Sequence, residues 1–154
     1  MQPVRVIGLG NRLRGDDAVG LHVARSLRGR VGRQVEVIEG VAGSLDLLEW
    51  IEGARQVILI DAARSGQPAG TIHRFDASTA GIGACLFPSS THALNVVDIL
   101  ELGRALGRLP PQVIVYGIEA VDLRDGEALS PAVAGAVEQV AAQVLRDLED
   151  MTHA

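Results

Sequence analysis

The chain has 154 residues, of which 47% are hydrophobic and only 3% aromatic, and its formal net charge is −5. This length predicts a single domain over residues 1–154, and the negative charge argues against a general nucleic-acid-binding protein. A single cysteine excludes an internal disulfide, which fits a reducing cytoplasm. The sequence lacks a signal-peptide pattern and any apolar run of the ~20 residues that span a bilayer, so we expect no membrane association.

Apolar runs typical of buried strands alternate along the chain with segments of helical periodicity. In the N-terminal half they predict strands at 4–9, 35–38 and 57–60, and helices at 17–27 and 45–51. In the C-terminal half they predict an antiparallel edge strand at 71–75, a helix at 94–106, a strand at 113–118 and a helix from Ser130-Pro131 to about Leu148. Residues 76–91 form the longest irregular stretch.

This alternation predicts an α/β fold. We expect a three-layer sandwich in which a twisted, mostly parallel sheet of about five strands, with one antiparallel edge strand, has helices on both faces. Ligands bind such sheets beyond the carboxyl ends of the strands. Polar residues fall there at three places: Asp16-Asp17 after the first strand, Asp61 at the end of the third, and His92 at a helix start. Because helices begin at the edge where parallel strands end, these residues can converge.

Each of these residues also has a purely structural interpretation. Asp16 and Asp17 could cap a helix, although two adjacent acids are costly unless something positive is held; we favour Asp16 as the structural carboxylate and Asp17 as the one that faces a ligand. Asp61 fits a cap of the next turn as well as it fits a site. His92 could be an ordinary turn residue, but the helix dipole there favours the neutral imidazole that metal coordination needs.

Two carboxylates and one imidazole form a mixed oxygen and nitrogen donor set that suits nickel, zinc, iron or manganese. Three ligands leave coordination positions open, which is typical of a metal that meets substrate or water. The remaining histidines and the cysteine have no comparable context, and we expect ordinary roles for His22, His73, His153 and Cys85.

A Gly-x-Gly turn at Gly8 and Gly10 also invites a dinucleotide-binding interpretation. The full motif requires a third glycine where this chain has Leu13, and Asp16 and Asp17 would repel a pyrophosphate. We therefore expect no organic cofactor. A non-catalytic domain that holds a metal or a small cationic ligand is the main alternative to an enzyme, and a nucleotide-binding domain is the second.

Five short motifs, in order along nearly the whole chain, suggest a family. They are Gly8-Leu9-Gly10-Asn11 with Asp16-Asp17, Ile60-Asp61-Ala62, Ser90-Thr91-His92, Val115-Tyr116-Gly117-Ile118-Glu119 and Leu129-Ser130-Pro131. With this ordered set the chain resembles the hydrogenase maturation proteases, which trim the C-terminal tail from the large subunit of nickel–iron hydrogenases.

The resemblance implies a cytoplasmic endopeptidase whose partner is the large-subunit precursor and whose nickel is delivered by that substrate. The positions with which the family is thought to engage nickel fall on Asp17, Asp61 and His92, with Asp16 in support. The resemblance names neither the attacking nucleophile nor the cleavage position. One loop departs from the family pattern, because Glu39-Gly40-Val41-Ala42 stands where Asp-Gly-Gly-Thr is usual, a change that bears on the substrate accepted.

Overall fold

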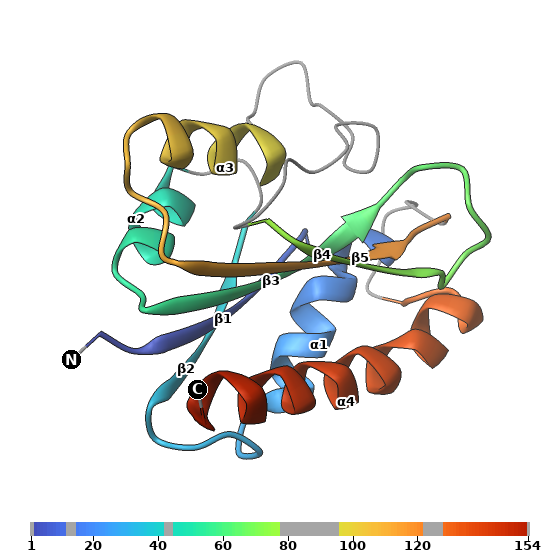
Figure 1. Ribbon diagram of the computed structural model, residues 1–154. Coiled ribbons are helices and arrows are strands. Elements are labelled where there is room, and N and C mark those ends of the chain that lie inside the picture. The colour runs from blue at the N-terminus through green and yellow to red at the C-terminus, as the bar shows by residue number, and fades with distance from the viewer. Residues whose placement is uncertain (1, 12–14, 42–44, 78–95, 122–127, 154) are drawn as a thin grey trace.

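A twisted five-stranded sheet forms the middle layer of the protein in the computed structural model (Figure 1). The structure describes residues 2–11, 15–41, 45–77, 96–121 and 128–153. The strand order is β2-β1-β3-β5-β4, and all neighbouring pairs are parallel except β4 with β5. The strands are β1 (Val4–Leu9), β2 (Val35–Gly40), β3 (Gln56–Ala63), β4 (Ile72–Asp76) and β5 (Gln112–Glu119). The predicted fold class, with its antiparallel edge strand, is confirmed.

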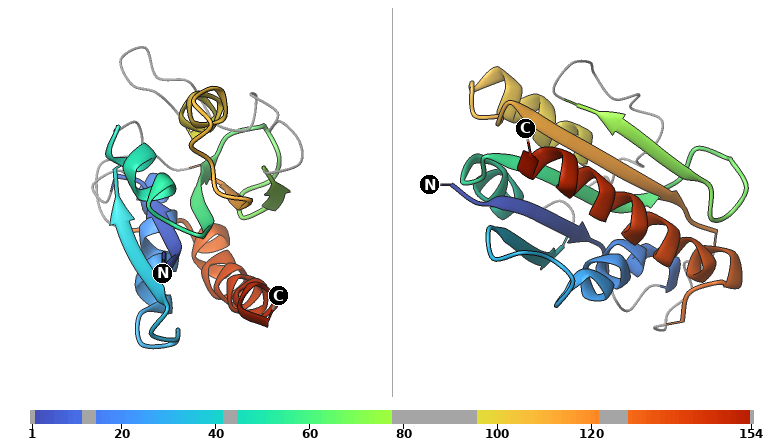
Figure 2. Two further views of the ribbon diagram at one scale, coloured as in Figure 1. Left: turned by 60° about the vertical axis from the view of Figure 1, so that its left-hand side comes forward. Right: turned by 60° about the horizontal axis from the view of Figure 1, so that its bottom comes forward.

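Helices cover both faces of this sheet (Figures 1 and 2). A short 3-10 turn, η1 (Gly15–Ala18), leads into α1 (Val19–Leu27), which lies beside α4 (Pro131–His153) on one face, whereas α2 (Asp46–Glu52) and α3 (Val96–Ala105) cover the other. Strands β1, β3 and β5 are buried on both faces, and this explains their nearly continuous aliphatic sequences. In the described ranges, no helix is both long enough and apolar enough to cross a membrane.

The elements differ from the sequence prediction mainly at their ends. Strand β3 continues past the predicted end to Ala63, so Asp61 lies within the strand. The helix predicted from Asp17 begins as the turn η1, and α4 extends beyond Leu148 because Met151 is still buried against the core. Most of the irregular stretch, residues 78–91, lies outside the described residues.

The backbone of α1 lies very close to β1 and β3 because glycine stands at the contact points. A Cβ atom at Gly20 would lie 2.3 Å from the carbonyl oxygen of Ile60 and 2.4 Å from that of Leu9. A Cβ atom at Gly8 would lie 2.2 Å from the carbonyl oxygen of Gly20. The start of α1, and with it the turn η1, is therefore held against the carboxyl ends of two adjacent strands.

We expect Gly20→Ala to lower the free energy of unfolding by about 3 kcal/mol, because a methyl group there meets backbone atoms that cannot rotate away. Gly135→Ala is the matched control, since Gly135 lies in α4 with nothing within 4 Å of an added Cβ. Gly135→Ala should raise the free energy of unfolding by about 0.5–1 kcal/mol, because alanine has a higher helix propensity than glycine. Urea unfolding of both variants measures the difference, and equal effects would contradict the close contact.

Candidate functional site

Asp61 is a buried carboxylate at the carboxyl edge of the sheet. It alternates along β3 with Leu59 and Ala63, so its side chain lies on the face covered by α2 and α3. It is only 8% exposed, and its Oδ1 accepts a hydrogen bond of 2.8 Å from the N–H of Ala62. Burial raises the pKa of the Asp61 carboxyl to about 7, the Ala62 hydrogen bond opposes the rise, and the charge of Asp17 adds to it.

Asp17 is the residue that the fold brings to Asp61. It lies in η1, is half-buried, and its negative charge contributes to the raised pKa of Asp61. Asp17 lies in the turn that follows β1, and Asp61 lies near the carboxyl end of the adjacent strand β3, at the point where the chain connections diverge to opposite sides of the sheet. The negative charge of Asp17 thus disfavours the ionised form of Asp61, and a bound cation would relieve the repulsion.

Asp16 has a different environment from its neighbour. Its side chain is fully buried, and its carboxylate accepts hydrogen bonds from the backbone N–H groups of Val121, at 3.0 Å, and Ser130, at 2.7 Å. The Ser130 hydroxyl donates a third bond of 2.9 Å. Asp16 thus connects η1 to the segment between β5 and the start of α4, and this connection fixes the turn that carries Asp17.

His92 and Cys85 belong to residues 78–95, which lie outside the described residues. The proposed third ligand is therefore not placed relative to Asp17 and Asp61. Within the ranges that the structure describes, no group of three or more His, Cys, Asp or Glu side chains could hold a metal ion. Of the three residues, the structure relates Asp17 and Asp61 to each other, through the effect of the Asp17 charge on the Asp61 carboxyl.

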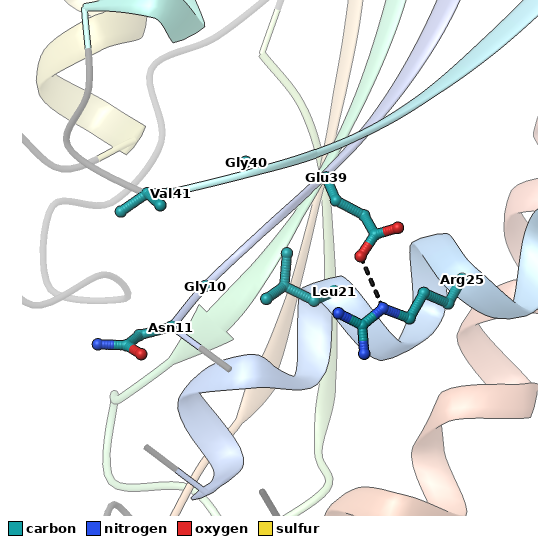
Figure 3. Close-up of a pocket in the computed structure, with 7 residues that line it drawn as sticks. All are labelled: Gly10, Asn11, Leu21, Arg25, Glu39, Gly40 and Val41. Atoms are coloured by element: carbon teal, nitrogen blue, oxygen red, sulfur yellow. Dashed lines mark hydrogen bonds and ion pairs between the residues drawn. The ribbon is translucent and has the colours of Figure 1, made fainter. Parts of the chain in front are cut away.

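A cavity of about 380 Å³ opens between the carboxyl ends of β1 and β2 (Figure 3), and neither Asp17 nor Asp61 is among its lining residues. Glu39 and Arg25 form an ion pair of 2.7 Å on one side, and Asn11 and Val41 lie toward the other (Figure 3). Partial burial opposes ionisation of Glu39, but the guanidinium groups of Arg25 and Arg28 hold its pKa below the usual range. The segment that departs from the family pattern therefore contributes to a cavity wall, and β1 separates its strand, β2, from the strand that carries Asp61.

The structure adds a third buried carboxylate, after Asp61 and Asp16, to the same edge of the sheet. Glu119, the last residue of β5, is 1% exposed and is bonded to His73 of β4 and to Ser65. Sequence reasoning treated His73 as ordinary, because nothing in the sequence around it indicates that β4 lies antiparallel beside the end of β5. The sequence signal that could have indicated this cluster was Glu119 itself, because it is an acidic residue at the end of an apolar strand.

The fold and the acidic edge define an α/β protein with a pair of neighbouring carboxylates, Asp17 and Asp61, and comparison with known proteins identifies its family. A family model described as hydrogenase maturation protease matches residues 21–147. A hydrogenase expression/formation protein (HupD) from Rhodobacter capsulatus is 30% identical over 94% of this chain and 70% of its own length. The hydrogenase 2 maturation protease of Escherichia coli is 29% identical, over 96% of this chain and 91% of its own length.

Solved structures share the fold. A hydrogenase maturating endopeptidase from Escherichia coli aligns with a TM-score of 0.82 and 24% identity over 97% of this chain and 93% of its own. A hydrogenase maturation protease from Thermococcus kodakarensis aligns with a TM-score of 0.72 and 21% identity, covering 96% and 93%. This chain belongs to the hydrogenase maturation protease family. Its endopeptidase relatives indicate that it is a hydrolase.

Asp16→Ala should lower the free energy of unfolding by about 3 kcal/mol, because it leaves two backbone N–H groups and a hydroxyl without their acceptor. Glu36→Ala is the matched control, since Glu36 is an exposed carboxylate paired with Arg5 and should change stability by less than about 1 kcal/mol. Urea unfolding distinguishes the two, and a small effect of Asp16→Ala would exclude the proposed anchoring role.

The stability difference between wild type and Asp61→Asn should depend on pH. The folded pKa of Asp61, about 7, lies above its ordinary value of 3.8. The contribution of this carboxyl to the free energy of unfolding is therefore complete below pH 4 and is lost as the pH rises through 7. Relative to wild type, the free energy of unfolding of Asp61→Asn should therefore increase by about 1 kcal/mol or more between pH 4 and pH 8. The control is the same comparison in an Asp17→Asn background, where the gain should shrink. A gain independent of pH would contradict the raised pKa.

Proposed function

We propose that this chain is an endopeptidase that removes the C-terminal tail of a nickel–iron hydrogenase large-subunit precursor after nickel has been inserted. Family membership supports the class of reaction, and the coupled carboxylates Asp17 and Asp61 carry the more specific statement. Burial and the charge of Asp17 make the Asp61 carboxyl hard to ionise, which favours binding of a positive ion there, and the nickel of the substrate is the ion that we propose.

The chemistry of the proposed donor residues is consistent with this role. Asp17 and Asp61 supply oxygen donors, and the proposed third donor is the imidazole nitrogen of His92; this mixed set suits a divalent transition metal. Three donors from the protease complete the coordination of an ion that the substrate already holds. In this proposal the precursor docks productively only when it carries nickel, so its own metal content decides whether it is cut.

The neighbouring residues position these donors. Asp16 holds η1 through Val121 and Ser130, and the close contact at Gly20 presses the start of α1 against β3. Both constraints hold the turn that carries Asp17 near Asp61 before substrate arrives, which lowers the ordering cost of binding. Because ligation requires ionised carboxylates and a neutral imidazole, cleavage should decline in acid.

The decisive assay compares nickel-loaded with nickel-free precursor by mass spectrometry. The wild-type protein should shorten only the loaded form, and Asp17→Asn, Asp61→Asn and His92→Ala should each reduce the cleavage rate by at least about 100-fold. Glu138→Gln is the matched control, since Glu138 is an exposed carboxylate of α4 paired with Arg30, and it should cut normally. Unchanged mass in both precursors would favour a non-catalytic binding role, and full activity of any site variant would remove that residue from the set.

A further inference from the structure

Glu119 is the centre of a hydrogen-bonded cluster that is separate from the Asp17–Asp61 pair. Its carboxylate accepts a bond of 3.1 Å from the backbone N–H of Ser65, a bond from the Ser65 hydroxyl, and a bond of 2.9 Å from Nε2 of His73. With 1% of its surface exposed, this carboxylate depends on those donors. Its position at the end of β5 is therefore rigidly defined.

The ring of His73 is held from two sides. Glu119 binds Nε2, and the ring stacks on Phe75, two residues along β4, with centroids 6.4 Å apart and planes 13° from parallel. Because a carboxylate only accepts hydrogen bonds, the proton of the neutral ring lies on Nε2 and Nδ1 keeps its lone pair. The side chain remains 18% exposed. A carboxylate that orients an imidazole in this way is the arrangement found where histidine transfers protons.

The register of the sheet places His73 near the proposed site. Gly117 of β5 pairs with Asp61 of β3 on one side and with His73 of β4 on the other. Phe75 packs in the same core as Leu59, so strand alternation puts Asp61 and His73 on one face of the sheet. Their Cα atoms are two strand spacings apart, about 9.5 Å. Gly117 contributes no side chain to the space between them.

We propose that His73, oriented by Glu119, is the residue that transfers the proton during hydrolysis of the scissile peptide bond. The inference rests on the proposed function and supplies a proton carrier that the two carboxylates and His92 do not provide while they bind the substrate's nickel. Glu119 acts in this scheme as a positioning residue, and its carboxylate stabilises the positive charge that develops on the ring.

The proton movements balance with water as the only co-reactant. Water adds to the carbonyl carbon of the peptide bond while one of its protons passes to Nδ1 of His73. The carbon–nitrogen bond then breaks, its electron pair stays on nitrogen, and the ring returns that proton to the leaving nitrogen. The second water proton leaves as the new carboxylic acid ionises, so the products are a carboxylate and an amine, and His73 is neutral again.

Replacement of His73 by glutamine separates catalysis from structure. The amide N–H of Gln can still donate to Glu119, but the amide cannot carry a proton at neutral pH. With nickel-loaded precursor as substrate, His73→Gln should lower kcat by about 100-fold or more while KM stays within about twofold. His73→Gly should lose activity similarly, and added imidazole should restore part of it. His22→Gln is the matched control, since His22 lies on α1, which covers the opposite face of the sheet.

The outcomes distinguish this inference from the proposed function. If wild type cuts the loaded precursor and His73→Gln has an equal kcat, or loses activity only through a higher KM, the proton-transfer role is wrong and the cluster serves structure alone. If wild type leaves the loaded precursor intact, the proposed function fails first and the role of His73 fails with it. Unfolding curves of the variants confirm that each activity is measured on folded protein.

Discussion

The contact between the backbone of α1 and the ends of β1 and β3 is the constraint on which the site depends. Gly8 and Gly20 allow carbonyl oxygens to approach positions where any side chain would collide with them. This contact places η1 over the end of β3, so a residue that follows the first strand meets one from the third. The proximity of Asp17 to Asp61 is thus a consequence of close helix–sheet packing, and a methyl group at position 20 would disturb it without touching either acid.

Asp16 and Asp61, two aspartates of this edge, have very different electrostatic environments. Asp16 is fully buried, and two N–H groups and a hydroxyl stabilise its carboxylate. Asp61 is nearly as buried but accepts only the N–H of Ala62 among its described hydrogen bonds, and its pKa rises accordingly. Folding thus satisfies the Asp16 carboxylate with internal donors and leaves the Asp61 carboxyl with a raised pKa. Such a division is typical of a site that gives up stability to bind a charged partner.

Several features could be predicted from sequence because they depend on local patterns. The alternation of apolar runs and helical periodicity gave the α/β class, and the weaker, more polar pattern around 71–75 indicated the edge strand. The predicted end of the third strand was too early, because Asp61 interrupts an apolar run that the backbone ladder continues to Ala63. The cluster of Glu119 with His73 was not predicted, because it depends on the register of two strands far apart in the sequence.

The sequence by itself determined the fold class, the family motifs and the candidate acids, since each is encoded in neighbouring residues or in short periodicities. Only the tertiary structure decided which acid is anchored, which is left electrostatically unsatisfied, and that His73 shares a sheet face with Asp61. The physical reason is that burial, charge coupling and strand register are relations between distant segments. They acquire definite values only when the chain packs.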